Sequence, residues 1–151
     1  MGTKFNGTQE EILALDGYIK LSRAAESVSR SINAHLSDYD LTISQFGALE
    51  ALYHLGPLPS GELGEKILKS SGNMTFVIDN LVKRGLVYRQ RREDDRRCVE
   101  IHLTEDGRRL IRDIWPDHLA GVVSTMSALS PDEQGQLAAL CRALGLSQVV
   151  E

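Results

Sequence analysis

The chain has 151 residues, of which 42% are hydrophobic and 25% are charged, and its formal net charge is −4. This composition is typical of a folded domain, no apolar run approaches the roughly 18 residues that a membrane-spanning helix needs, and the polar N-terminus lacks the pattern of a signal peptide. We therefore expect a cytoplasmic protein without a membrane partner.

The first predicted element is a long amphipathic helix over residues 10–37. A helix of this length would be about 40 Å long, which is long for a chain of this size, so we expect it to pack against something beyond its own subunit. The apolar residues that recur at helical spacing are Leu21, Ala25, Val28, Ile32 and Leu36.

Three shorter helices are predicted next. Thr42 and Gln45 have the spacing of a capping box at the start of the second helix, and Gly56 would end it. Ser60 is expected to cap a short third helix, and the fourth is expected to run over residues 71–84. The residues expected to face inward are Phe46, Leu49, Leu52, Tyr53, Leu63, Ile67, Leu68, Met74, Val77, Ile78, Leu81 and Val82.

After Gly85, a C-terminal stop for the fourth helix, the apolar spacing changes toward a period of two. This change predicts two strands, over residues 86–89 and 98–103, that are joined by a charged hairpin. Helical spacing resumes after the second strand, until Pro116 kinks or ends the helix. The run Ser130-Pro131-Asp132-Glu133 predicts the start of a last helix.

Two short helices joined by a tight turn and followed by a basic β-ribbon have the layout of a winged helix-turn-helix. We therefore predict a mainly α fold with a small β-wing. A winged helix-turn-helix lobe would occupy residues 41–107. The N- and C-terminal helices, residues 10–40 and 108–151, would form a dimerisation base.

Positive charge is concentrated in one short stretch. Residues 83–97 contain seven basic and three acidic residues, which is a local charge of +4 in a chain of net charge −4. Because charges more than about 10 Å away are largely screened, a bound duplex would respond to this stretch rather than to the net charge. The distribution predicts double-stranded DNA as a partner.

The fourth helix is the candidate recognition helix. Hydroxyls and backbone N–H groups at its N-terminus suit phosphates, and asparagine can pair with adenine. Phe76 would either touch a thymine methyl group or pack between helices, and a solvated amphipathic helix is the alternative for the whole segment. The residues expected to contact DNA are Ser70, Ser71, Gly72, Asn73, Thr75, Phe76, Asn80 and Lys83.

The hairpin tip is the candidate wing. Arginine favours narrow minor grooves, where the negative potential is enhanced, so Arg91, Arg92, Arg96 and Arg97 are expected to reach DNA. An acid two residues before an arginine can pair with it and hold the shape of the tip, and we assign Asp95 this orienting role toward Arg97. A plain exposed charge run is the alternative.

Several short motifs in the predicted lobe resemble those of MarR-type (multiple antibiotic resistance regulator) proteins. The combination of Lys-Arg-Gly-Leu-Val, Asp-x-Arg and Leu-Thr-x-x-Gly is specific, although each piece alone is weak. Phe76 departs from the pattern, because many members carry arginine there. The stretches that carry the resemblance are Ile43–Phe46, Glu62–Glu65, Leu81–Val87, Asp95–Arg97, Leu103–Thr104 and Gly107.

The resemblance implies a transcriptional regulator, most simply a repressor. It would be a homodimer whose first and last helices interlock and whose two lobes read a pseudo-palindromic operator. The resemblance also implies a small aromatic or lipophilic effector that binds between the helical base and the lobe and biases the spacing of the two lobes.

No enzyme, cofactor or metal site is predicted. The four histidines, His35, His54, His102 and His118, are widely spaced, and none forms the i, i+4 pair of a zinc enzyme. We expect each to be a packing or surface residue. No nucleophile and base occur in a recognisable pattern.

Two alternatives to effector control are open. Cys98 follows two arginines, and nearby cations can make a thiol reactive, so a redox-sensing regulator of the same fold is one alternative. A helical adaptor protein that binds no nucleic acid is the other. Cys141, on an apolar helix face, is expected to be a packing residue.

Overall fold

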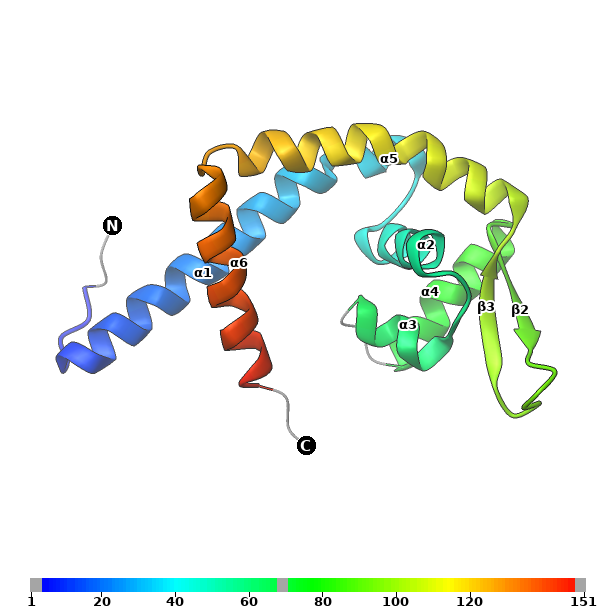
Figure 1. Ribbon diagram of the computed structural model, residues 1–151, viewed down its shortest axis with the longest axis horizontal. Coiled ribbons are helices and arrows are strands. Elements are labelled where there is room, and N and C mark those ends of the chain that lie inside the picture. Colours follow the sequence, from blue (N-terminus) through cyan, green and yellow to red (C-terminus); the bar gives the residue numbers. More distant parts are fainter. Residues whose placement is uncertain (1–3, 68–70, 149–151) are drawn as a thin grey trace. The chain divides into compact units, whose positions relative to one another are not determined.

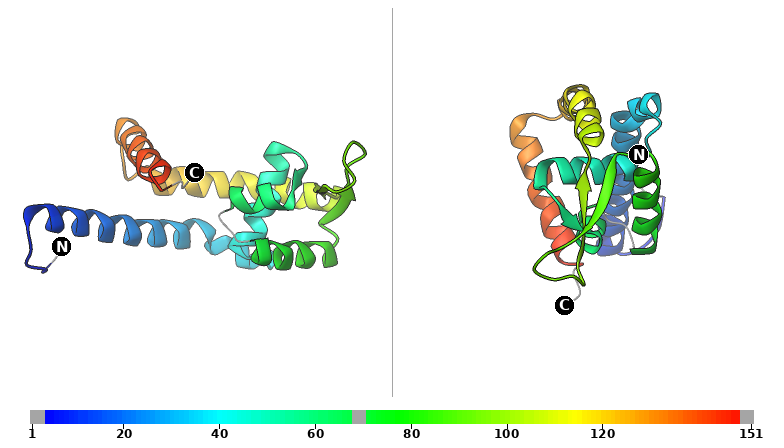
Figure 2. Two further views of the ribbon diagram at one scale, coloured as in Figure 1. Left: turned by 90° about the horizontal axis from the view of Figure 1, so that it is seen from below. Right: turned by 90° about the vertical axis from the view of Figure 1, so that its right-hand side faces the viewer.

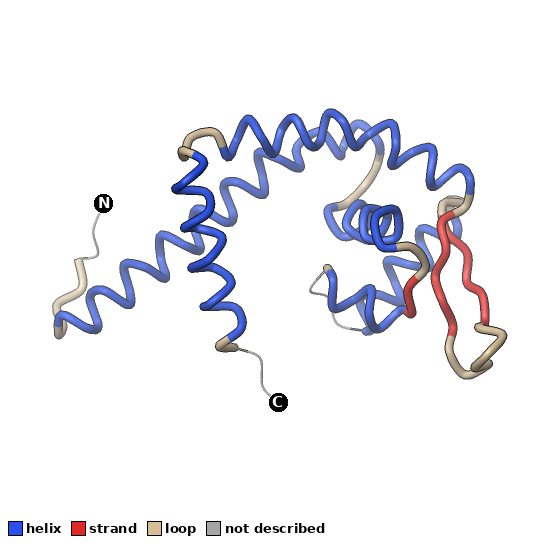
Figure 3. The backbone as a smooth tube through the Cα atoms, in the orientation of Figure 1, coloured by secondary structure: helices blue, strands red, loops and turns tan. Residues whose placement is uncertain are grey.

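The computed structural model describes residues 4–67 and 71–148, and most of them are helical (Figures 1 and 3). The prediction of a mainly α fold with a small β-wing is confirmed. The helices are α1 (Gln9–Asn33), the 3-10 helix η1 (Ala34–Tyr39), α2 (Ile43–Leu55), α3 (Ser60–Lys66), α4 (Ser71–Lys83), α5 (Glu105–Met126) and α6 (Pro131–Leu146). The strands are β1 (Leu58–Pro59), β2 (Val87–Arg91) and β3 (Val99–Leu103).

The sheet has one strand more than the predicted ribbon. Its order is β1-β3-β2, with both pairs antiparallel. Leu58 of β1 lies opposite Ile101 of β3. A strand of two residues is too short to show a period of two, so sequence patterning could not predict β1. The β2–β3 hairpin extends beyond α2–α4 (Figure 1; Figure 2, left).

The chain divides into two compact units. The central unit, His35–His118, contains α2, α3, α4, the sheet and the first part of α5. The terminal unit consists of the chain before His35 and the chain after His118, and it contains α1 and α6.

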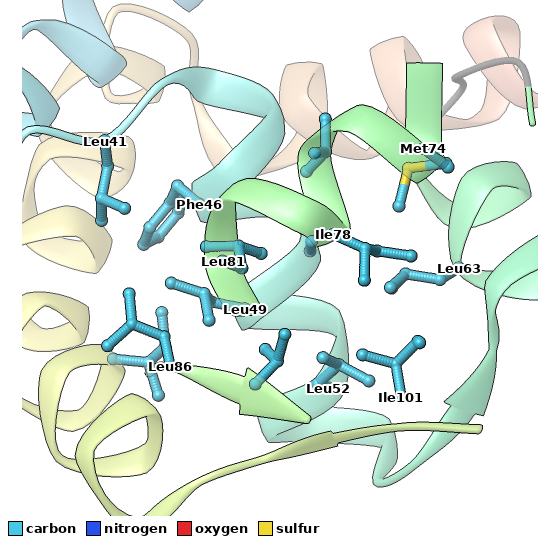
Figure 4. Close-up of a cluster of buried hydrophobic side chains, with 14 of the residues drawn as sticks. Leu41, Phe46, Leu49, Leu52, Leu63, Met74, Ile78, Leu81, Leu86 and Ile101 are labelled. Carbon is cyan, nitrogen blue, oxygen red and sulfur yellow. The ribbon is translucent and has the colours of Figure 1, made fainter. Parts of the chain in front are cut away.

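The hydrophobic core of the central unit is formed by the inward faces of its helices and by the sheet (Figure 4). Most of the expected inward residues are buried, whereas Tyr53 and Ile67 are half-buried and Leu68 lies outside the described residues. The prediction for Val82 is wrong, because its side chain is 37% exposed. Each helical residue turns by about 100°, so Val82 lies beyond the stripe that ends at Leu81. The buried members from α2–α4 are Phe46, Ala48, Leu49, Leu52, Leu63, Met74, Val77, Ile78 and Leu81.

The long first helix is shorter than predicted. It begins after Thr8, which forms a capping box with Glu11, and it ends at Asn33, where the chain tightens into η1. Neither α1 nor α6 contains a buried residue in the single chain. The large hydrophobic side chains exposed in the terminal unit are Phe5, Leu13, Tyr18, Leu21, Leu119, Val123, Leu137, Leu140, Leu144 and Leu146.

Two further expectations about helix ends are corrected. Pro116 does not end its helix, since α5 continues through it to Met126. Ser60 is not the cap of α3, because the preceding Pro59 occupies that position and Ser60 is already helical. The caps expected at Thr42 and Ser130 are present, each as a full capping box.

Candidate nucleic-acid interface

Helix α4 presents a polar outer face that carries one large aromatic side chain. The core side of the helix is formed by Met74, Ile78 and Leu81, while Phe76 points outward with 71% of its surface exposed. The alternative that Phe76 packs between helices of its own chain is therefore wrong.

The other expected contact residues of α4 lie on its accessible sides. Asn73, Thr75 and Lys83 are exposed, and Asn80 is half-buried. Ser70 lies outside the described residues, and Ser71 and Gly72 are described only as the first backbone positions of α4. The structure thus places four polar candidate residues and Phe76 on one short helix.

A salt bridge that the sequence did not predict links α4 to the wing. Arg89 Nη2 of β2 lies 2.5 Å from Asp79 Oδ1 of α4, and both side chains are partly exposed. The bond neutralises the one acid of α4 and occupies one of the arginines counted as DNA-binding charge. The signal for this link in the sequence was a single acidic residue on the outer face of a helix that precedes an arginine-rich strand.

The hairpin tip is held by its own side chains. Arg97 donates to Asp95 Oδ1 from both its backbone N, at 3.1 Å, and its side-chain Nε, at 3.2 Å, yet the Arg97 side chain remains 93% exposed. This is the pair expected from the sequence. It holds one edge of the Arg97 guanidinium and leaves the rest of the group exposed to solvent.

The other arginines of the tip also have partners. Arg92 makes a two-bond contact with the carboxylate of Asp94, which lowers the pKa of Asp94 and raises that of Arg92. Arg91 Nη1 donates to the Arg96 carbonyl at 2.9 Å. Among the described residues, Arg96 takes part in none of the ion pairs, so the Arg96 and Arg97 guanidiniums are the cations most available to a ligand.

The base of the wing depends on a close backbone approach. Gly85 has a φ of +71°, and Thr104 Oγ1 donates to its carbonyl at 2.6 Å and accepts from Gly107 N at 3.0 Å. A Cβ at Gly107 would collide with the carbonyl oxygen of Leu86. The Leu-Thr-x-x-Gly pattern therefore packs the start of α5 onto the chain entering β2.

A groove of about 740 Å³ runs along α2 and the end of α3. Its lining is mostly apolar, and burial raises the pKa of its one carboxyl group, Glu50, while nearby His54 opposes the shift. The residues that line it are Ile43, Ser44, Gly47, Glu50, Ala51, His54, Leu55, Lys66 and Ile67.

The two cysteines are in different settings. Cys98 is half-buried at the end of the hairpin, where the backbone N–H of Arg92 donates to the Cys98 carbonyl at 3.0 Å. Cys141 is exposed in the single chain, so its expected packing role is not met within one subunit.

The described residues contain neither a candidate metal site nor a candidate membrane-spanning helix. No group of three or more histidine, cysteine or acidic residues among them could hold a metal ion. None of the described helices has the length and apolar character that crossing a membrane requires.

Comparison with known proteins gives consistent matches. The sequence pattern of the MarR family matches residues 41–99. The HTH-type transcriptional regulator MhqR of Bacillus subtilis is 37% identical over 130 residues, which are 86% of this chain and 90% of MhqR.

Two solved structures share the fold. BpsR of Bordetella bronchiseptica, whose DNA binding is regulated by 6-hydroxynicotinic acid, has a TM-score of 0.76 and 28% identity, covering 89% of this chain and 94% of BpsR. AbsC of Streptomyces coelicolor, a MarR family transcriptional regulator, has a TM-score of 0.80 and 22% identity, covering 96% of this chain and 97% of AbsC.

Proposed function

Because the chain belongs to the MarR family of DNA-binding transcriptional regulators, we propose that it is a homodimeric repressor that occupies a pseudo-palindromic operator and leaves it when a small effector binds. Membership of this family sets aside an enzyme and a helical adaptor that binds no DNA. The observation that carries the proposal is the pairing, within one compact unit, of a helix with polar side chains on its outer face and a hairpin whose tip arginines are exposed.

On this proposal, α4 enters the major groove and the hairpin reaches the adjacent minor groove. Asn73, Thr75, Asn80 and Lys83 contact bases or phosphates from α4, together with Ser70–Gly72 at its start. Arg96 and Arg97 supply the cations of the wing, whereas Asp95 holds Arg97 in position. Arg91 and Arg92, which bond within the hairpin, mainly shape it.

The exposed apolar side chains of α1, α5 and α6 support the dimer. Large apolar patches on a single chain commonly mark protein–protein interfaces, and closed two-fold symmetry is the commonest arrangement of homo-oligomers. In such a dimer the two α4 helices would enter major grooves about 34–36 Å apart, one helical turn of DNA.

The groove along α2 supports the effector part of the proposal. An apolar lining with a few polar groups is typical of small-molecule sites, and Glu50 and His54 would orient an aromatic or lipophilic ligand. BpsR, a relative by structure, is regulated by an aromatic acid. The ligand would release DNA only through different affinities for the bound and free arrangements of the lobes.

The proposal is tested by fluorescence anisotropy with the duplex upstream of the protein's own gene. We expect binding that weakens steeply with salt, because lysine and arginine displace counterions from DNA. The double variant Arg96→Ala/Arg97→Ala should bind much more weakly at moderate salt, while Arg30→Ala, which removes an exposed cation of the terminal unit, should not. If the double variant binds DNA as tightly as the wild-type protein, the wing does not contact DNA as proposed.

Redox control through Cys98 is a second candidate, favoured by the position of Cys98 directly after Arg96 and Arg97 and opposite Arg92 in the hairpin. A cation beside a thiol stabilises the reactive thiolate. If an oxidant releases DNA from the wild-type protein but not from Cys98→Ser, this candidate is supported. An unchanged response in Cys98→Ser would discard it.

A further inference from the structure

Phe76 has the highest exposed fraction of the large hydrophobic residues described in the central unit. A single exposed apolar side chain is ordinary on a protein surface, so exposure alone decides nothing. The position of Phe76 on α4 and the chemistry of the residues around it carry the argument further.

The position is the outermost line of α4. At about 100° per residue, Phe76 lies roughly opposite the stripe formed by Met74, Ile78 and Leu81, which are buried in the core. Asp79 and Lys83 follow on the same line, three and seven residues later. A helix that seats this face in a major groove brings the phenyl ring against the edges of the bases.

The side chains around Phe76 offer little to a G·C base pair, whose guanine favours arginine and whose cytosine favours a free carboxylate. Helix α4 contains no arginine, which is the residue that most often binds guanine through two bonds, and its Asp79 is engaged by Arg89. Lys83 is in the last turn, whereas recognition helices contact bases mainly through their N-terminal residues. Asn80, one turn after Phe76, has the amide that suits adenine.

We infer that Phe76 is a specificity-determining residue that packs against the 5-methyl groups of thymines, so that α4 selects A·T base pairs. Thymine is the base with a methyl group in the major groove, and apolar side chains read it by contact. The inference rests on the proposed entry of α4 into that groove, and it names the base chemistry read there.

The test removes the methyl group alone. Duplexes bound by the full-length protein are first selected from a randomised 30-base-pair library, and the selected duplex is then synthesised with each thymine replaced in turn by deoxyuridine. At one or more positions in each half-site, the wild-type protein should lose about fourfold in affinity, the change that corresponds to one buried methyl group. Phe76→Ala should bind the parent duplex more weakly and show no loss at those same positions.

Phe5→Ala is the matched control, since Phe5 is an exposed phenylalanine outside the central unit and outside the groove along α2. It should keep the wild-type response to deoxyuridine. Thermal melting of both variants shows whether they are folded. If the wild-type protein binds a selected duplex but no deoxyuridine lowers its affinity, or if Phe76→Ala keeps the same losses, the inference is overturned while DNA binding stands. If no duplex is selected, the proposed function fails as well.

Discussion

The imidazole rings of His35 and His118 lie 5.2 Å apart, centroid to centroid, at the two residues where the chain enters and leaves the central unit. His118 is only 8% exposed, and its ring is also 4.4 Å from that of Phe46 and 5.8 Å from that of Trp115. Among the described residues, His118 Nδ1 and His35 Nε2 are buried without a hydrogen-bond partner. Burial, and then the neighbouring His35, lower the pKa of His118 below its usual 6.5.

This pair predicts that the protein becomes less stable in mild acid. The unfolded chain takes up a proton on His118 at a higher pH than the folded chain does, so the free energy of unfolding falls as the pH drops below 6.5. In His118→Phe, where an apolar ring replaces the imidazole, this fall should be smaller. Urea unfolding at pH 7.5, 6.5 and 5.5, at one protein concentration, measures the difference between the two proteins.

Glu50 has the opposite effect on the pH dependence of stability. Burial raises its pKa, so near that pKa the folded chain binds more protons at Glu50 than the unfolded chain does, and the free energy of unfolding rises as the pH falls. Since Glu50 is present in both proteins, its contribution cancels in the comparison. His102→Gln, on the wing, is the control for the loss of a histidine. Parallel pH profiles for the wild type and His118→Phe would contradict the assignment.

A second prediction concerns the close approach at the base of the wing. Gly107→Ala should lower the free energy of unfolding by about 1–3 kcal/mol, the usual cost of overpacking, because its Cβ would meet the Leu86 carbonyl. Gly121→Ala, in the same helix and with no atom within 4 Å of its added Cβ, should instead raise it by up to about 1 kcal/mol. Chemical denaturation of the two variants tests the contrast, and equal effects would show that the backbone there moves freely.

The third prediction separates the cation that binds DNA from the acid that positions it. Arg97→Ala should weaken operator binding by about 1–3 kcal/mol and reduce the salt slope by about one. Asp95→Ala removes the partner that positions Arg97, so it should lower specific affinity. Because it keeps Arg97 and removes a nearby negative charge, its salt slope should be no shallower than that of the wild type. Binding isotherms at several salt concentrations measure both quantities. If Asp95→Ala leaves specific affinity unchanged, the orienting role is wrong.

Local patterns in the sequence were sufficient to predict the helices of the central unit. The stripe of Met74, Ile78 and Leu81 and the capping box at Thr42 both lie within a few residues of chain, so spacing alone predicts them. Val82 fails for a related reason: an apolar residue at the edge of a stripe has the right spacing, and only the packed neighbours decide whether it is covered.

Contacts between distant segments could not be predicted in the same way. His35 and His118, which were each expected to be a packing or surface residue, meet because the fold brings η1 against α5. The arginines of residues 83–97 were counted as free charge, but Arg89 bonds α4 and Arg84 donates to the backbone carbonyls of Tyr39 and Asp40. Charge in a sequence thus locates the candidate interface, whereas the salt bridges decide which cations remain for DNA.

The last prediction concerns the Asp79–Arg89 salt bridge, whose acid lies on the side of α4 that is proposed to face DNA. Both side chains are partly exposed, and exposed pairs stabilise proteins by at most about 1 kcal/mol, so Asp79→Ala should change stability little. The substitution releases Arg89 and removes a negative charge, so affinity for a duplex of unrelated sequence should rise a few-fold at low salt, with a salt slope about one unit steeper.

Arg89→Ala should have the opposite effect, since it leaves Asp79 without its counter-charge against the phosphates. Anisotropy titrations with one unrelated 30-base-pair duplex at two salt concentrations compare the three proteins. Should Asp79→Ala bind this duplex more weakly than the wild type, the bridge would serve to hold β2 against α4, and the orientation of the wing would contribute more to affinity than the charge of the helix.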